Sequence, residues 1–495
     1  MKALGTKLVQ KNTKLRIVKP QEHNMKPRLN LNLGMASEAI ATPSDNHPLD
    51  VFGAILDKLK PIDFRKMAQL GPRDQLTSTN EVVIIIRQIV KTAADLGLEL
   101  CLAENRIYTF TGSFWHAVGG DEFQNFLSKA SIRLGADEMS ASHHRFQEQL
   151  TKQFRSVAVR SVPPSSPEKT LINLRNGTFE VTESGRSLRR PNASDFLRYQ
   201  LPFSYLSEAK CPRWDRFLDE VLPDKATQNI LAEYFAYVLT DLKLEQVLFL
   251  YGSGSNGKSV VFDVMHAIFG NENVTHYDLS QLSHETHLAM IAGKLLNYST
   301  EVSRRFDFEL FKKLVSREPV AARHLYGKPF SLNKYARLAF NCNQLPQHLE
   351  RSEAFFRRML VIHFQKVISK SKRDPNLAKT IIKNELPGVF NWLLSGLDRL
   401  QKNEEFSECK PADELLDEYK NNSDIVQQFL DEAGYEKVLE QKHGTMLQIM
   451  FDEYRAFCER AGEVMMSRRW LRSQLELKGF KAHKIGLGIL VFAKR

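Results

Sequence analysis

The sequence predicts an α/β fold organised around one segment, and three observations in that segment support the prediction. The apolar run Val247–Tyr251 is typical of a buried strand. The next eight residues, Gly252–Ser259 (GSGSNGKS), fit the pattern G-x-x-x-x-G-K-[ST]. From Val260 to Ile268 apolar residues recur at helical spacing, and Gly270 follows as a candidate C-cap. A strand, a glycine-rich loop and a helix in this order predict a loop that binds phosphate.

The residue types of this loop match the chemistry of a bound triphosphate. Glycines allow backbone N–H groups to surround a phosphate without Cβ clashes, and the N-terminus of the following helix adds donors and a favourable dipole. We expect Lys258 to neutralise the β- and γ-phosphates and Ser259 to ligate Mg²⁺. The alternative is an ordinary Gly/Ser loop, which the complete match with its flanks makes the weaker interpretation. The predicted nucleotide-binding residues, with ATP and Mg²⁺ as ligands, are Gly252, Ser253, Gly254, Ser255, Asn256, Gly257, Lys258, Ser259 and Val260.

The composition limits the class of protein. The chain has 495 residues, 42% hydrophobic and 26% charged, which is ordinary for a soluble globular protein of about two to four domains. A formal net charge of +11 makes an anionic partner plausible without identifying it. The five cysteines are scattered and none forms a C-x-x-C pair, so we expect reduced thiols and neither a disulfide framework nor a zinc site. Without a signal-type apolar core or a run approaching a membrane span, the sequence predicts a soluble cytoplasmic protein with no membrane partner.

Changes in composition divide the chain into six predicted segments. Up to Gly34 there are eight Lys/Arg residues and one acidic residue, Glu22, which favours a disordered basic leader over an ordered domain. Such a tail would add non-specific affinity for nucleic acid. The segments are a leader (1–50), an α+β N-terminal domain (51–160), a linker with a β-hairpin (161–210), the core that contains the glycine-rich loop (211–368), a helical segment (369–435) and a winged-helix domain (440–495).

Local patterns predict several elements around the loop. Apolar spacing and turn residues indicate a helix running from Val82 to Leu100, a hairpin within Asn105–Val118, two strands about an Asn-Gly turn within Leu171–Val181, helices at Cys211–Asp224 and Thr227–Leu239, and a helix at Asp413–Phe429.

Polar residues at strand ends complete a candidate hydrolytic site. Glu301 lies near the end of the short predicted strand Lys294–Val302, where a carboxylate orients an attacking water or holds Mg²⁺ through water. Asn343 ends the next strand, where an amide bonds the γ-phosphate or that water. Arg357 and Arg358 precede a further strand, as an arginine finger reaching a neighbouring subunit's γ-phosphate would require. The alternatives are an exposed strand-end Glu, an Asn that opens the turn before a proline, and a surface Arg pair.

Two segments point to nucleic acid. Ala321–Ala339 folds back around Tyr326–Pro329 as a hairpin with a basic tip, which either contacts phosphates or faces water. At the C-terminus, a helix over Asp452–Ala461, a helix over Ser467–Lys478 with Ser467 as N-cap and a hairpin with Gly486 and Gly488 at its turn form winged-helix patterning with a basic face. The alternative for that face is a basic protein-docking module. The predicted DNA-binding residues are Arg323, His324, Tyr326, Lys328, Arg468, Arg469 and Arg472.

Taken in order, these motifs resemble the superfamily 3 AAA+ helicases, and most closely the branch with the phage and plasmid primase-helicases and the poxvirus primase-helicase. The resemblance covers about residues 171–364 strongly and the flanks weakly. It is carried by the glycine-rich loop, Glu301, Asn173–Thr178 (NLRNGT), Cys211–Trp214 (CPRW), Ala322–Phe330 (ARHLYGKPF), Asn343–Pro346 (NQLP) and Phe356–Arg358 (FRR).

The resemblance implies roles for these residues. Lys258 and Ser259 would form Walker A, Glu301 would be the Walker B carboxylate, Asn343 the sensor-1 residue, and Arg357 or Arg358 the finger acting in trans. The hairpin centred on Tyr326–Lys328 would enter the channel of a homo-hexameric ring and grip single-stranded DNA. One departure is Thr300, where a second acid often stands, so that Mg²⁺ would rest on Ser259 and waters. The first 170 residues lack zinc-binding cysteines and a carboxylate cluster, so we expect any primase to be a separate partner.

The function predicted first is an ATP-dependent helicase on single-stranded and forked DNA that replicates a phage, plasmid or other mobile element. Two alternatives remain open from the sequence. One is an ATP-regulated origin-binding or initiator protein without processive unwinding. The other is a nucleic-acid-sensing defence ATPase, for which the sequence offers no effector motif such as a nuclease.

Overall fold

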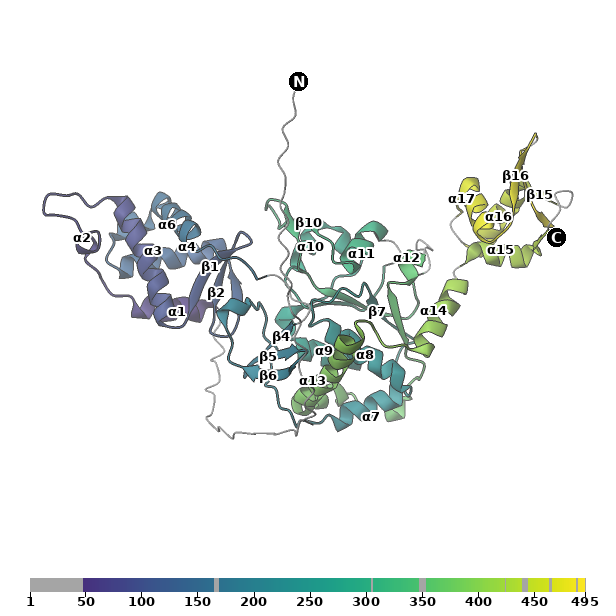
Figure 1. Ribbon diagram of the computed structural model, residues 1–495, viewed down its shortest axis with the longest axis horizontal. Helices are drawn as coiled ribbons and strands as arrows, with labels where there is room; N and C mark the ends of the chain where they lie inside the picture. Colours follow the sequence, from purple (N-terminus) through teal and green to yellow (C-terminus); the bar gives the residue numbers. More distant parts are fainter. Residues whose placement is uncertain are drawn as a thin grey trace, which may run out of the picture. The chain divides into compact units, whose positions relative to one another are not determined.

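The computed structural model describes residues 48–163, 169–303, 306–346, 353–422, 424–438, 444–462, 465–486 and 488–494 (Figure 1). The basic leader predicted for residues 1–50 falls, up to residue 47, outside the described residues.

The centre of the fold is a five-stranded sheet in the order β13-β7-β12-β9-β8, with every neighbouring pair parallel. This mixed α/β architecture with a parallel sheet agrees with the predicted fold class. The strands are β7 (Val247–Tyr251), β8 (Val274–Thr275), β9 (Leu296–Ser299), β12 (Arg337–Cys342) and β13 (Met359–His363). The predicted central strand and the helix after the glycine-rich loop, α9 (Lys258–Phe269), are both confirmed.

Helices cover both faces of this sheet. Successive strand residues point to opposite sides, so the strands present apolar side chains to both layers. Leu248 and Leu250 of β7 enter one core with α7 (Pro212–Val221), α8 (Lys225–Tyr237), α9 and α13 (Leu377–Asn403). Val247 and Phe249 enter a second core with α10 (Glu285–Met290) and α11 (Phe308–Val315). Figure 1 shows the two helical layers on either side of β7. Short pieces complete the core: the hairpin β10 (Val320–Ala322) and β11 (Phe330–Leu332), and α12 (Glu353–Phe356).

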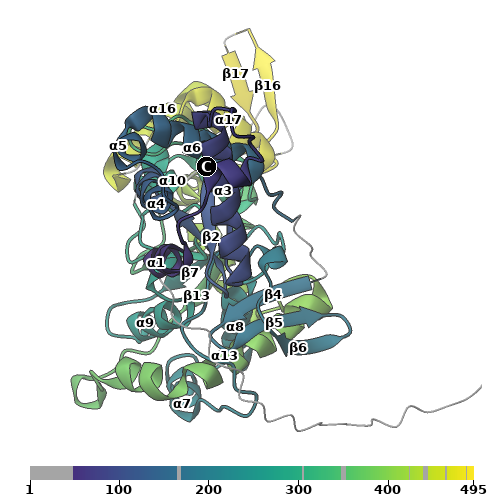
Figure 2. The same ribbon diagram turned by 90° about the vertical axis from the view of Figure 1, so that its left-hand side faces the viewer.

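A second, antiparallel sheet packs against the first of these cores. Its strands are β4 (Lys169–Leu174), β5 (Gly177–Thr182) and β6 (Gly185–Arg189), which lie side by side in Figure 2. Ile172 and Phe179 from this sheet share a core with α8 and α13. The Asn-Gly hairpin expected here is confirmed, and the structure adds the third strand.

The N-terminal part has its own core of helices beside a three-stranded antiparallel sheet. Its elements are α1 (Pro48–Lys58), α2 (Phe64–Met67), α3 (Ser78–Asp95), β1 (Glu99–Ala103), β2 (Arg106–Phe110), β3 (Trp115–Val118), α4 (Gly120–Arg133), α5 (Glu138–Ser142) and α6 (His144–Val157). The hairpin at Asn105–Val118 is confirmed. The helix predicted to run to Leu100 is wrong in its second part: α3 ends at Asp95, and Gly97, at φ +70°, turns the chain so that Leu100 lies in β1.

The C-terminal part is a compact unit of three helices and short strands. After α14 (Lys410–Asn422) come α15 (Ile425–Ala433), α16 (Leu447–Ala461) and α17 (Arg468–Leu477), and the sheet order is β15 (Thr445–Met446), β17 (Gly488–Val491), β16 (Ala482–Ile485). A pair of β14 (Glu436–Lys437) with β18 (Ala493–Lys494) completes it.

The predicted terminal hairpin and the Ser467 N-cap are confirmed, since the Ser467 hydroxyl accepts from the Trp470 N–H. The single helix predicted over Asp413–Phe429 is wrong: it is divided, because the Asp424 side chain caps a new helix by accepting from the Gln427 N–H.

All five cysteines are buried free thiols. No helix in the described ranges has the length and apolar character needed to cross a membrane.

A buried carboxylate joins two helices of the first core. Glu233 on α8 is fully buried and accepts from Arg399 Nε on α13 at 2.6 Å, from the Ser407 N–H at 2.9 Å and from the Ser407 hydroxyl at 2.8 Å.

We predict that Glu233→Ala lowers the free energy of unfolding by about 3 kcal/mol, because the Arg399 charge and the Ser407 donors lose their partner. Guanidinium denaturation followed by tryptophan fluorescence measures this. The control Glu148→Ala removes a carboxylate that is 56% exposed, and should cost under about 0.5 kcal/mol; equal losses in the two variants would contradict the prediction.

Candidate functional site

The glycine-rich loop follows the carboxyl end of β7, and main-chain and side-chain hydrogen bonds to β12 and to the segment after β13 hold it in place. The Gly252 N–H donates to the Cys342 carbonyl oxygen at 3.2 Å, and Asn256, 2% exposed, donates through Nδ2 to the Phe364 carbonyl at 3.0 Å. The Ile368 N–H donates to the Ser255 carbonyl at 2.9 Å. The segment that follows β13 therefore anchors the loop, while Ser253, Gly254 and Ser255 stay exposed.

Lys258 is a buried cation surrounded by neutral oxygens. Its Nζ lies 2.5 Å from the Gly252 carbonyl, 3.3 Å from the Ser253 carbonyl, 3.0 Å from Asn256 Oδ1 and 3.5 Å from Asn343 Oδ1. The residue is 4% exposed, and burial lowers the pKa of its ammonium group. A buried charge that meets only neutral acceptors is stabilised further by a nearby anion, so this position suits a phosphate.

The residues around the loop fit a bound triphosphate and its metal. Gly257 has φ +92° at the start of α9, and a Cβ there would lie 2.9 Å from Phe217 Cε2 of α7. The loop can hold this tight form only with glycine. Ser259, in the first turn of α9, is exposed, so a cation beside the loop can reach its hydroxyl.

Parallel strands bring the predicted strand-end residues to the same edge of the sheet as the loop. Cys342 pairs with Tyr251, so Asn343 directly follows the strand beside β7, and its side chain reaches Lys258. Ser299 pairs with Phe340, and Glu301 follows two residues later with an exposed side chain. The Glu301 main chain is fixed by the Ser299 hydroxyl, which donates to its carbonyl at 2.9 Å. Asn343 and Lys258 are therefore in contact, while Glu301 lies one strand further along the edge.

The paired arginines lie at the opposite edge. Met359 pairs with Val247 and His363 with Tyr251, so Arg357 and Arg358 precede the amino end of β13. A five-residue strand puts them about 16 Å from the loop of the same chain.

The two arginines differ in their surroundings. Arg358 has an 8% exposed side chain that donates to the Ala354 carbonyl at 2.7 Å, to Glu245 at 3.2 Å and to the Ser316 hydroxyl at 3.1 Å. Arg357 is exposed. Only Arg357 is therefore available to another molecule without breaking internal contacts.

The β10–β11 hairpin presents an exposed tip. Tyr326 is fully exposed at φ +58°, and Lys328 is also exposed. Arg323 forms an ion pair with Glu285 at 3.3 Å, and His324 stacks on Phe330 with ring centroids 5.3 Å apart. Burial, and then the charge of Arg106, lowers the pKa of His324, so its ring favours the neutral form. Tyr326 and Lys328 are thus the tip residues most open to a ligand.

The basic helix α17 is partly engaged within its own unit. Arg468 donates to Gln448, and Arg472 donates to Glu476 at 2.8 Å, whereas Arg469 is exposed. Within the described ranges no group of three or more His, Cys, Asp or Glu side chains is arranged to hold a metal ion.

The sequence did not predict the groups that contact the glycine-rich loop from α7 and from the segment after β13. Phe364 and Ile368 act through main-chain atoms, which carry no residue signature, and Phe217 of α7 meets Gly257 only in the folded chain. It also missed five basic residues around a cavity at the amino edge of the sheet, because they are far apart in sequence: Lys169, Arg198, Lys294, Arg317 and Lys334.

Comparisons with known proteins give two family matches, each spanning less than half of the chain. Residues 91–223 match the family described as "D5 N terminal like", and residues 250–358 match a "Family of unknown function (DUF5906)". The first match fits the phage-type primase-helicase resemblance of the motifs. The second runs from the end of β7 to Arg358 and so contains the loop, Glu301, Asn343 and the hairpin.

Three solved structures resemble the chain at low identity. "The A form apo structure of NrS-1 C terminal region-CTR" is 14% identical with a TM-score of 0.47, covering 82% of this chain and 97% of that one. A second A form, "CTR(305-718)", is 14% identical with a TM-score of 0.47 over 81% and 98% of the two chains. "The apo structure of NrS-1 C terminal region (305-718)" is 14% identical with a TM-score of 0.48 over 84% and 99%.

Two of the three glycines of the loop, Gly257 and Gly254, allow a matched test of its geometry. We predict that Gly257→Ala lowers the free energy of unfolding by about 2 kcal/mol, because the new Cβ meets Phe217 and a left-handed backbone conformation is strained for alanine. Gly254→Ala should cost under about 0.5 kcal/mol, because nothing lies within 4 Å of a Cβ there and its φ is not positive. Chemical denaturation measures both, and similar values would contradict this account of the loop.

Proposed function

We propose that this chain is an ATP-dependent DNA helicase of the superfamily 3 AAA+ class, a ring-forming motor on single-stranded DNA in the replication of a phage, plasmid or other mobile element. The observation that carries the proposal is the contact of Lys258 with Asn343, 3.5 Å apart across the ends of neighbouring strands, beside a glycine-rich loop. The D5 N-terminal-like match and the DUF5906 match over the same site support it.

Hydrolysis is assigned to the carboxyl edge of the sheet. Loop N–H groups and Lys258 would bind the β- and γ-phosphates, and Asn343 would position the attacking water. Glu301 would take the proton from that water as its oxygen bonds to the γ-phosphorus and the bond to the leaving oxygen breaks. Bound Mg²⁺ would supply further neutralisation of phosphate charge, with Ser259 as the residue that holds it.

A second subunit is required for a complete site under this proposal. Arg357 cannot reach its own loop across the five residues of β13, and its exposure suits a γ-phosphate on a neighbouring copy. Arg358 is assigned a supporting role, because its contacts with Ala354, Glu245 and Ser316 hold the turn that presents Arg357. A homo-hexameric ring would supply one such pair at each interface.

DNA is assigned to the hairpin and to the C-terminal unit. Tyr326 can stack on a base and Lys328 can bind a phosphate, with Arg323 and His324 supporting the hairpin base. The arrangement of α15, α16 and α17 with the β16–β17 hairpin supports the assignment of a winged helix, and Figure 2 shows this hairpin extending past the helices.

The exposed Arg469 on α17 favours a second candidate function, an ATP-regulated origin-binding protein. Unwinding of a forked substrate separates it from the helicase, because an origin-binding protein would footprint duplex DNA without separating strands.

The shared site predicts complementation between two inactive variants. Lys258→Ala and Arg357→Ala should each lower ATP hydrolysis at least about 10³-fold, and unwinding should be lost with it. In an equal mixture about a quarter of the interfaces would pair an intact loop with an intact Arg357, so activity should return in that proportion. The control Arg133→Ala changes an exposed arginine of α4 and should keep full activity. Mixed rings that form yet stay inactive would contradict the shared site. An Arg357→Ala protein that hydrolyses ATP at the wild-type rate would contradict it too.

The hairpin predicts a specific loss of DNA response. Lys328→Ala should weaken binding of a fluorescent dT oligomer several-fold, with the slope of log affinity against log salt smaller by about 1, and should reduce the stimulation of hydrolysis by DNA. Fluorescence anisotropy measures the binding. Lys129→Ala, at an exposed position of α4, removes the same charge away from the hairpin and should bind as the wild type does. Equal binding by all three proteins would remove the hairpin from the DNA path.

A further inference from the structure

A cavity of about 340 Å³ lies at the amino edge of the central sheet, on the opposite side from the glycine-rich loop. The core contributes the loops before β9 and β12 and the chain after α8, including Lys294, Thr240 and Tyr335. The β4 strand and the segment around Phe196 form the other wall.

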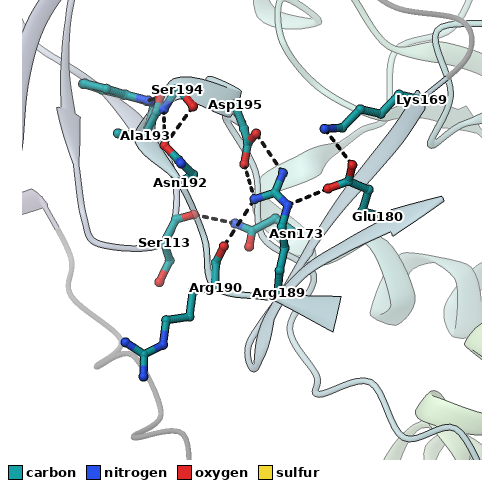
Figure 3. Close-up of polar contacts among 11 residues, drawn as sticks. Ser113, Lys169, Asn173, Glu180, Arg189, Arg190, Asn192, Ala193, Ser194 and Asp195 are labelled. Carbon is teal, nitrogen blue, oxygen red and sulfur yellow. Dashed lines mark hydrogen bonds and ion pairs between the residues drawn. The ribbon is translucent and has the colours of Figure 1, made fainter. Parts of the chain in front are cut away.

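The charged groups of the cavity are mostly basic. Five basic side chains and two carboxylates line it. On the β4 side the charges are balanced: Arg189 binds both oxygens of Asp195 at 2.8 Å and Glu180 at 2.6 Å, and Lys169 pairs with Glu180 at 2.7 Å (Figure 3). The Asp195 carboxylate therefore does not oppose an anion in the cavity.

On the core side, carboxylates of the described residues match the cations only weakly. Lys294 donates to the carbonyl of Glu272, and Arg317 lies over the Tyr335 ring at 5.5 Å. Lys334 has only a loose pair with Asp241 at 3.6 Å, and both of those side chains are partly exposed.

A buried guanidinium lies behind this wall. Arg337 is 4% exposed, lies over the Tyr237 ring at 3.6 Å and donates to the Tyr237 hydroxyl at 2.5 Å and to the carbonyls of Thr240 and Leu242, which are all neutral groups. Its Nε is buried without a hydrogen-bond partner among the described residues. Burial first, and then the charge of Arg317, lowers its pKa to about 10. Arg198, which lines the cavity, likewise has a buried Nη2 without a partner in the described chain.

We propose that this cavity binds a phosphate-bearing nucleotide unit, with the phosphate against Lys294, Arg317 and Lys334. An anion there would compensate cations that the protein buries or leaves unmatched. Pockets for drug-sized ligands measure about 300–1,000 Å³, so the volume suits one nucleotide and greatly exceeds what inorganic phosphate needs. The Thr170 hydroxyl in the lining can bond the sugar or base, and the hydroxyl oxygens of Ser194 and Thr240, which donate to Asn192 and Tyr237, can still accept from it. The ligand is either a free mononucleotide or one nucleotide of a strand, and the site does not depend on ATP hydrolysis at the other edge.

The test neutralises two lining lysines. Lys294→Gln/Lys334→Gln is compared with the charge-matched control Lys152→Gln/Lys410→Gln, whose side chains are 77% and 86% exposed on α6 and α14. All proteins carry Lys258→Ala, so that the glycine-rich loop contributes equally. Thymidine 5′-monophosphate is titrated by calorimetry and a fluorescent dT oligomer by anisotropy, and the cavity variant should bind the true ligand at least about tenfold more weakly than the control.

Each outcome decides the proposal. If the cavity variant binds the monophosphate more weakly than the control does and binds the oligomer equally well, the ligand is a free nucleotide. If it binds only the oligomer more weakly than the control does, the ligand is one nucleotide of a strand. Equal affinities in the two double variants for both probes would overturn the proposal, because charge would then act without regard to position. If the cavity variant melts more than about 3 °C below the control, Arg317→Gln replaces it under the same criteria.

Discussion

The whole arrangement depends on a parallel sheet that is covered on both faces. Leu248 and Leu250 face one core while Val247 and Phe249 face the other, so the first four residues of β7 carry no polar side chain. Functional polar groups are therefore confined to the two edges. Because the strands are parallel, all the chain segments that leave them emerge at one edge, where the loop, Asn343 and Glu301 gather.

Each edge holds a buried cation that has no carboxylate partner among the residues that the structure describes. Lys258 at the carboxyl edge and Arg337 at the amino edge are both 4% exposed, and both donate to neutral oxygens. Neutral acceptors satisfy the donors but leave the charge itself uncompensated, which keeps each edge favourable to an anion. With a net charge of +11, the chain carries this preference beyond any single site.

One strand connects the surface assigned to the neighbouring subunit with the loop. Arg357 lies two residues before β13, and the segment after that strand bonds the loop through Phe364 and Ile368. Under the proposed shared site, movement of Arg357 at one interface would pass along five paired residues to the loop of the same chain. All five residues of β13 pair with β7, so a displacement along β13 would strain this ladder of hydrogen bonds.

Much of the local structure was predictable because it depends on neighbours in sequence. The strand, loop and helix of residues 247–269, both expected hairpins of the N-terminal half and the Ser467 cap follow from short-range patterns. The misjudged helix ends have local causes too, since Gly97 and Asp424 are turn and cap residues whose effect competed with apolar spacing.

What the sequence by itself determined is the identity of the groups at strand ends: Lys258, Asn343, Glu301 and the two adjacent arginines. Only the tertiary structure decided which of them meet, and it also distinguished Arg358, tied to three internal partners, from its exposed neighbour. The cavity at the amino edge could not be predicted either, because its basic residues come from β4 and from separate loops between residues 169 and 334. The reason is physical: the apolar spacing and turn residues that form a strand, loop or helix are neighbours in sequence, whereas burial and charge compensation are properties of everything that packs around a group.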